Sequence, residues 1–173
     1  MGTSYAIRQL QNYPNCVVAT SSNKGLALLE YKNEQWVFKH FIKGFEKRIR
    51  YIVEDNKDNL WLTANHQLHK IRLNEALDNV SFSQEFVGDK FHLPESFIMP
   101  YRLNNGEIIF GTDKGVYRYV SDENYFEPNP DFPMFKEGVF HLMQNATENT
   151  IWFVSIRSTA LYSQSFYKTF IEL

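Results

Sequence analysis

The sequence predicts an all-β protein made of four repeats of a four-stranded antiparallel sheet, and two observations lead to this prediction. Short apolar segments rich in Val, Ile, Phe, Tyr and Trp alternate along the chain with turns rich in Asn, Asp, Gly and Pro. Similar pairs of such segments also recur at a nearly fixed spacing, as repeat architectures require. Helical periodicity is nearly absent, and a turn or two over Asn74–Asn79 is the only helical candidate.

Each repeat is centred on a predicted β-hairpin, and the four hairpins begin at Cys16, Leu60, Ile108 and Ile151. Each hairpin carries a small or hydroxyl residue just before its turn, and these anchors are 44, 48 and 43 positions apart: Thr20, Ala64, Thr112 and Ser155. The loop from Ser83 to Ser96 is expected to absorb the longer middle step. Further strands are predicted before the hairpins at Ile7–Leu10, Ile49–Val53, Phe97–Leu103 and Val139–Met143, and after them at Trp36–Phe41, Val80–Gln84, Asn124–Phe126 and Phe166–Phe170.

Four-stranded antiparallel units at this period are typical of the blades of a β-propeller, whose sheets stack face to face around a central axis. The predicted blades span about 5–41, 48–84, 97–126 and 138–170, so residues 1–173 form a single β-propeller segment. The alternative is a sandwich or barrel of about sixteen strands, but such folds seldom repeat one hairpin four times. We therefore expect a partial propeller.

Composition and charge exclude several classes of function. Lys and Arg number 18 against 20 Asp and Glu, and a net charge of −2 argues against nucleic acid or an anionic membrane as a partner. No apolar run exceeds four residues, so we expect no membrane insertion by this segment. The only cysteine, Cys16, lies in an apolar strand, where an inert buried thiol is expected.

Motifs for catalysis or cofactor binding are missing from the sequence. His66 and His69 have the odd spacing that sends side chains to opposite faces of a strand, which makes them a poor pair of metal ligands. Nucleophile elbows, phosphate-binding glycine loops and zinc-binding histidine motifs do not occur. We expect no metal, no cofactor and no catalytic residue, so the segment itself is not predicted to be an enzyme.

Two stretches, Arg48–Ala64 and Gly106–Tyr119, resemble the two-component regulator propeller repeat. That repeat has a strand ending in an acidic pair, a Gly-Asn turn, Leu-Trp, an apolar residue, Gly-Thr and then Gly-Leu. The matching residues are Glu54, Asp55, Asn59, Leu60 and Trp61 in the second repeat, Gly111, Thr112 and Gly115 in the third, and Ile151 and Trp152 in the fourth. The second repeat departs from the pattern at Asp58, Thr63 and Gln67, which stand where the family has glycine.

The motif residues are interpreted as structural. We expect Trp61 and Trp152 to supply ring surface between blades, and Gly111 to let a neighbouring backbone approach. Gly25 and Gly115 are expected to adopt a positive φ in their hairpins.

The resemblance also implies a context. Propellers of this family form the periplasmic sensor region of hybrid histidine kinases of Bacteroidetes such as Bacteroides, which detect oligosaccharides and control transcription across the inner membrane. The expected partners are therefore an oligosaccharide, the remaining blades of a parent protein, and a second copy of the chain, because the outer faces of the first and last blades are apolar. A protein-interaction scaffold or a carbohydrate-active enzyme on the same fold is the alternative.

Candidate ligand-binding residues lie in the turns between the second and third strands of each blade. Each of these turns carries a cationic or ionisable side chain: Lys24, His66, Lys114 and Arg157. The turns at the other end carry acids instead: Glu54, Asp55, Asp58, Glu107 and Glu148. The two ends are thus predicted to differ in sign, and a guanidinium such as Arg157 suits the carboxylate or sulfate of an acidic saccharide. Trp36 and Tyr101 are candidates for stacking on a sugar ring, or else strand residues of a core or edge.

Overall fold

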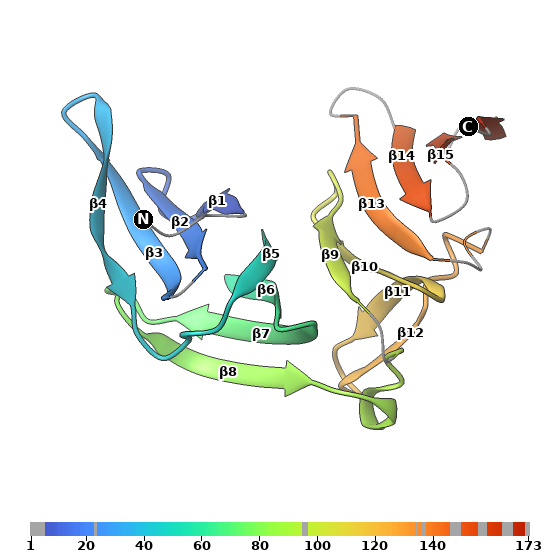
Figure 1. Cartoon of the computed structure of the whole chain (residues 1–173), viewed down its shortest axis with the longest axis horizontal. Coiled ribbons are helices and arrows are strands. Elements are labelled where there is room, and N and C mark those ends of the chain that lie inside the picture. Colours follow the sequence, from blue (N-terminus) through green and yellow to red (C-terminus); the bar gives the residue numbers. More distant parts are fainter. Residues whose placement is uncertain are drawn as a thin grey trace. The chain divides into compact units, whose positions relative to one another are not determined.

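The computed structural model describes residues 6–22, 24–94, 97–133, 135, 138–145, 150–155, 159–163 and 168–171. The chain divides into two compact units, Met1–Phe86 and Val87–Leu173. Each unit contains two four-stranded sheets whose strands follow one another in chain order, as Figure 1 shows for each sheet.

The first unit holds the first and second sheets. The first sheet consists of β1 (Ile7–Gln9), β2 (Cys16–Ser21), β3 (Gly25–Lys32) and β4 (Gln35–Ile42). The second sheet consists of β5 (Ile49–Glu54), β6 (Asn59–Ala64), β7 (Gln67–Leu73) and β8 (Val80–Phe86). All neighbouring strands pair antiparallel.

The second unit holds the third and fourth sheets. A single turn of 3₁₀-helix, η1 (Asp89–Phe91), precedes the third sheet, which consists of β9 (Met99–Arg102), β10 (Ile108–Thr112), β11 (Gly115–Val120) and β12 (Tyr125–Pro128). The fourth sheet consists of β13 (Val139–Gln144), β14 (Thr150–Ser155), β15 (Thr159–Ser163) and β16 (Lys168–Ile171). Four antiparallel four-stranded sheets confirm the predicted fold class.

The helical candidate at Asn74–Asn79 is wrong, because this segment is a turn between β7 and β8. The side-chain oxygen of Asn74 accepts hydrogen bonds from the backbone N–H groups of Asp78 and Asn79, each at 3.1 Å, and Leu77 has a φ of 56°. Such local side-chain bonds compete with helix formation. The segment expected to be a loop from Ser83 instead begins within β8, which continues to Phe86.

The core of the first unit lies between its two sheets. Alternate residues of β2 and β3 face the second sheet, among them Val18 and Leu28, which are 0% and 1% exposed. Leu60, Leu62 and Ala64 of β6 belong to the same buried cluster. The period of two between buried positions is what an antiparallel strand produces, and each sheet contributes one apolar face to this core.

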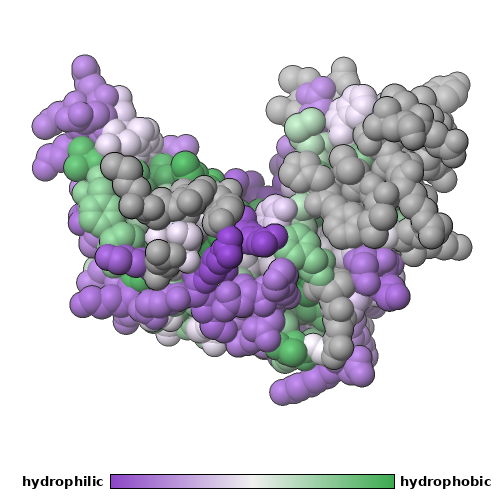
Figure 2. All heavy atoms as spheres, viewed as in Figure 1, coloured by the Kyte–Doolittle hydropathy of each residue, from purple (hydrophilic) through white to green (hydrophobic). Residues whose placement is uncertain are grey.

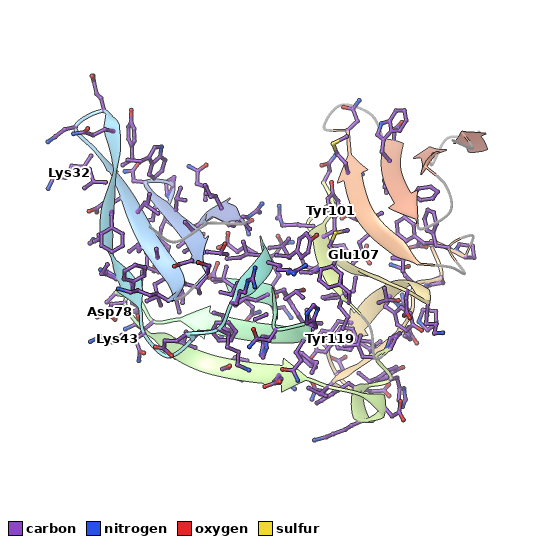
Figure 3. The ribbon with its side chains drawn as sticks, in the orientation of Figure 1. Lys32, Lys43, Asp78, Tyr101, Glu107 and Tyr119 are labelled. Carbon is purple, nitrogen blue, oxygen red and sulfur yellow. The ribbon has the colours of Figure 1, made fainter. Side chains whose placement is uncertain are left out.

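The segment between β4 and β5 ties the two sheets of the first unit together. Lys43 forms a parallel bridge with Asn79, and its N–H donates to the carbonyl of Asp78 at 2.9 Å; the side chains of Lys43 and Asp78 are labelled in Figure 3. Two residues later, the carbonyl of Phe45 lies so close to Gly25 that a Cβ on this glycine would be only 1.8 Å from the carbonyl oxygen. Gly25 has a φ of 71°, so the predicted positive φ is confirmed and a close approach of backbone accompanies it.

The opposite face of the first sheet, here called the outer face, carries exposed aromatic side chains. Trp36, Phe38 and Phe41 of β4 are 46%, 53% and 37% exposed. By the strand register they share this face with Tyr31, whose ring lies 5.2 Å from that of Trp36. Figure 2 shows hydrophobic residues gathered along β4, next to a hydrophilic hairpin tip. The outer face is therefore an apolar surface without a protein neighbour among the described residues.

Candidate functional site

The acidic pair of the second sheet, Glu54 and Asp55, is the best-defined polar feature of the first unit. The Asp55 carboxylate accepts hydrogen bonds from the backbone N–H groups of Lys57 and Asn59, at 2.8 and 2.9 Å, and from the indole Nε1 of Trp61 at 3.0 Å. Burial alone raises the pKa of Asp55, but these bonds outweigh it, so its pKa lies below the ordinary value. Asp55 therefore holds the turn between β5 and β6 and orients Trp61.

Trp61 is a buried residue that packs within its own sheet, and the ring surface between blades expected of it stays a prediction. Its ring is 2% exposed and stacks on Phe86 with the ring centres 5.6 Å apart, while Lys70 Nζ lies 5.1 Å from the ring centre. Trp152 differs, because 40% of its side chain is exposed. It lies on β14 between its partners Met143 and Leu161, and Met143 is also exposed at 58%. The fourth sheet thus has a second apolar surface among the described residues.

Gly111 and Thr112 are both buried in β10. The Thr112 hydroxyl donates to the carbonyl of Gly115 at 2.9 Å and accepts from the N–H of Lys114 at 3.0 Å. Gly115 has a φ of 113°, which confirms the predicted positive φ in this hairpin. The close approach of a backbone to Gly111 stays a prediction.

Glu54 connects the first sheet to the second. Its Oε2 accepts a hydrogen bond from the backbone N–H of Gln11 at 2.9 Å, and the Gln11 side chain donates to the carbonyl of Asp55 at 3.0 Å. Glu54 is 3% exposed, and this burial raises its pKa, although the Gln11 bonds and the Arg8 cation act in the opposite direction. A third bond, from the Asn12 side chain to Asp58 Oδ1 at 2.7 Å, joins the same two turns.

The second unit contains the same joint at the equivalent positions. Gln144, the last residue of β13, accepts through Oε1 from the N–H of Asn104 at 2.6 Å, as Glu54 at the end of β5 accepts from Gln11. The Asn104 side chain donates to the carbonyl of Asn145 at 2.8 Å. We call such a pair of bonds a turn latch: in the first unit it joins Gln11 to Glu54 and Asp55, and in the second it joins Asn104 to Gln144 and Asn145. In addition, the Gln144 N–H donates to the hydroxyl of Tyr101 at 2.6 Å; Tyr101, labelled in Figure 3, is thus a structural residue of β9.

A cavity of about 190 Å³ lies beside the turn latch of the first unit. Three turns form its wall, namely those that follow β1, β5 and β7, and its apolar lining includes Leu10, Leu60 and Leu77, which are 4%, 1% and 7% exposed. Glu54, Asp58, Glu75 and Arg72 supply its charged groups. The Arg72 guanidinium donates through Nε and Nη2 to Asn59 Oδ1, at 3.2 and 2.9 Å. The cavity therefore lies at the acidic end of the sheets.

The sequence did not indicate this cavity, because its wall comes from three separate turns, spread along the chain from Leu10 to Leu77. The predicted binding residues lie in other turns, those that follow β2, β6 and β10. Lys24, His66 and Lys114 are exposed there, and their role in ligand binding stays a prediction. Lys24 Nζ lies 4.7 Å from the centre of the Phe41 ring, while Asn65 and His66, with φ of 50° and 67°, form the two-residue turn between β6 and β7. Arg157 lies outside the described residues.

His69 and Cys16 are buried, and neither is a candidate for a catalytic or metal-binding residue. The Cys16 thiol lies in the core and its pKa is raised by burial, as expected of an inert thiol. His69 is 1% exposed and packs edge-on against Phe45; burial and the Lys47 cation lower its pKa to about 4.

Within the described ranges, the structure contains no cluster of three His, Cys, Asp or Glu side chains that could hold a metal ion. No helix in that part of the chain has the length and apolarity to cross a membrane.

No protein-family model and no curated protein matches the sequence. Solved structures do match. The extracellular domain assigned to a hybrid two-component system of B. thetaiotaomicron is similar with a TM-score of 0.67 and 19% identity, and the match covers 98% of this chain and 22% of that one. The Dos1 propeller matches with a TM-score of 0.63 and 9% identity, over 99% of this chain and 48% of that one.

An enzyme has a similar fold as well. Virginiamycin B lyase from Staphylococcus aureus matches with a TM-score of 0.59 and 11% identity, over 100% of this chain and 56% of that one. The chain thus spans about a fifth of the length of the two-component system domain and about half of the other two. At these identities the likeness shows the fold, and it agrees with the resemblance of the sequence motifs. The four sheets are β-propeller blades.

Proposed function

We propose that this chain is part of the extracytoplasmic, ligand-sensing propeller of a hybrid two-component histidine kinase. One observation carries the proposal: 98% of the chain matches in fold the extracellular domain assigned to such a system. The resemblance of Arg48–Ala64 and Gly106–Tyr119 to the regulator propeller repeat supports it. The parent protein would span the inner membrane, place this segment in the periplasm and control transcription. The full-length gene tests this, because a signal sequence upstream and a histidine kinase downstream are expected, and a gene without a kinase would contradict the proposal.

The ligand is proposed to be an oligosaccharide with acidic groups, bound at the hairpin turns that carry Lys24, His66, Lys114 and Arg157. The exposure of the first three side chains supports this placement. Charge-assisted hydrogen bonds from lysine or arginine to a carboxylate or sulfate add about 1.5 to 3 kcal/mol each. The proposed role is binding, because the most buried carboxylates described, Glu54 and Asp55, are already held by structural hydrogen bonds.

Calorimetric titration with neutral and acidic oligosaccharides tests this ligand class. Lys114→Ala and Arg157→Ala are each expected to weaken binding of an acidic oligosaccharide by about 1 to 3 kcal/mol. Lys32→Ala is the matched control, because Lys32 is an exposed lysine at the other end of its sheet, next to the turn between β3 and β4 (Figure 3). Equal affinity of all three variants and the unmodified chain would contradict the proposed face.

The outer face of the first sheet is proposed to pack against a further propeller blade, supplied by the parent protein or by a second copy of this chain. The opposite face of the same sheet already packs in this way against Leu60, Leu62 and Ala64. In the isolated chain, the second copy is the expected occupant. Light scattering should then show a concentration-dependent mass, and Trp36→Ser with Phe38→Ser should reduce it. A constant monomeric mass at micromolar concentrations would contradict self-association.

A further inference from the structure

The cavity beside the turn latch has the size and the apolar floor of a small-molecule site. Its volume of about 190 Å³ exceeds that of the engineered apolar cavity of roughly 150 Å³ that binds benzene. Leu10, Leu60 and Leu77 are almost fully buried, so they present a preformed apolar surface rather than a flexible one. A ligand of about seven non-hydrogen atoms would fill such a space.

The charged groups around this floor are mainly acidic. Glu54 is buried at the wall, while Asp58 and Glu75 are exposed at the rim, and Arg72 is the one cation in the lining. Three carboxylates and one guanidinium give the lining a formal charge of −2 when all are ionised. Two of the guanidinium nitrogens already donate to Asn59 Oδ1, which holds the Arg72 side chain in place. The local field therefore favours a cation over an anion.

The carboxylates that line the cavity keep acceptor capacity for a ligand. A carboxylate has about four lone-pair sites; Glu54 Oε2 accepts from the Gln11 N–H and Asp58 Oδ1 accepts from the Asn12 amide, which leaves acceptor sites on both carboxylates. Both bonds come from uncharged donors, and the Arg8 cation, which acts to lower the pKa of Glu54, is not among the residues that line the cavity. A metal ion is a poorer fit, because no described group of three acidic or histidine side chains has metal-binding geometry and the floor is hydrocarbon.

We propose that this cavity binds a small molecule that carries an ammonium group on a compact aliphatic body. The ammonium contacts the Glu54 and Asp58 carboxylates, with Glu75 at the rim, and the aliphatic body packs on Leu10, Leu60 and Leu77. This site is separate from the hairpin-turn site of the proposed function and does not depend on it. It lies at the opposite, acidic end of the sheets, between the turn that follows β1 and the turns of the second sheet.

Three probes of similar shape and different charge test the proposal: cyclohexylammonium, cyclohexanol and cyclohexanecarboxylate. Titration calorimetry or NMR titration of the full chain at pH 7 should give saturable binding of cyclohexylammonium with a Kd on the order of 1 mM. Cyclohexanol should bind at least about tenfold more weakly, because it lacks the charge. Cyclohexanecarboxylate should not bind. Equal binding of cyclohexanol and cyclohexylammonium, or preferred binding of the carboxylate, would overturn the proposal.

Variants at the rim test the placement without disturbing the core. Asp58→Asn with Glu75→Gln should weaken cyclohexylammonium binding at least about tenfold, since both side chains are exposed and their loss should leave the fold intact. Leu73 lines the cavity and is half-buried, so the larger side chain of Leu73→Trp should fill the cavity and block binding. Asp122→Asn with Glu123→Gln is the matched control, because it removes two exposed acids from the second unit. Unchanged binding in both the rim and the Leu73→Trp variants would place the probe elsewhere and overturn the proposal.

Discussion

Gly25→Ala should destabilise the first unit, and the structure allows its cost to be worked out. The new Cβ would lie 1.8 Å from the Phe45 carbonyl oxygen and 2.9 Å from its carbon, so the backbone must separate by roughly 1.2 Å to reach even 3.0 Å, the shortest separation that Cβ atoms show. Phe45 is 4% exposed, and its ring contacts His69. Such overpacking costs about 1 to 3 kcal/mol. The φ of 71° adds about 1 kcal/mol for an alanine.

Gly44→Ala is a matched control for the backbone conformation. Gly44 has a φ of 87°, but a Cβ there would first meet the side-chain oxygen of Asn79 at 3.2 Å, which can move aside. Both substitutions also lower the entropy of the unfolded chain by the same amount, so this effect cancels in the comparison. We expect Gly44→Ala to cost about 1 kcal/mol and Gly25→Ala about 2 to 4 kcal/mol.

Urea unfolding followed by circular dichroism measures both free energies. The difference of about 1 to 3 kcal/mol between the variants is the contribution of the close approach. If the two variants lose the same stability, the positive φ alone explains the glycine, and the contact between the hairpin and the Phe45 backbone contributes nothing.

Three further predictions concern polar side chains. The pKa of His69 falls from 6.5 to about 4 on folding, so stability that is fully present above pH 6.5 should be lost as the pH falls toward 4, by up to about 3 kcal/mol. Urea unfolding measured at a series of pH values should show a shallower loss of stability in His69→Gln. Equal losses in His69→Gln and the unmodified chain would refute this. Asp55→Asn should cost about 2 to 4 kcal/mol, because the NH₂ that replaces one carboxylate oxygen would face either the backbone N–H groups of Lys57 and Asn59 or the indole N–H of Trp61. Asp122→Asn should change stability little, and similar urea midpoints for the two variants would contradict this role. Gln144→Glu should keep the turn latch of the second unit, since Glu54 accepts at the equivalent position of the first. Gln144→Met removes the acceptor and should cost about 1 kcal/mol in urea unfolding, and equal stability of both variants would argue against the latch.

The sheets could be predicted from the sequence because strand patterns are local. The apolar residues of β6 and β7, the polar turn between these strands and a positive φ at Gly25 or Gly115 each depend on a few neighbouring residues. The helical candidate failed for an equally local reason that composition does not reveal, namely the geometry of the Asn74 side chain.

The cavity and the turn latch could not be predicted, because both join residues from different sheets. Gln11 and Glu54 are 43 positions apart, and the donor is a backbone N–H that any residue except proline supplies. The motif marked Glu54 and Asp55 as a pair, but it did not show that one braces its own turn and the other reaches the preceding sheet. Likewise, the charges around the cavity come together only once the turns after β1, β5 and β7 lie side by side.

The turn latch has a consequence for how such repeats can diverge in evolution. Of the four groups that make its two bonds, the Gln11 N–H and the Asp55 carbonyl belong to the main chain, and so do their counterparts at Asn104 and Asn145. Mutation cannot remove these groups, short of introducing a proline at the donor. The side chains need only an acceptor at the strand end, which Glu54 and Gln144 both provide, and a donor in the turn, which Gln11 and Asn104 both provide. Substitutions can therefore accumulate until sequence comparison finds little, while the joint between neighbouring blades, and with it the fold, is retained.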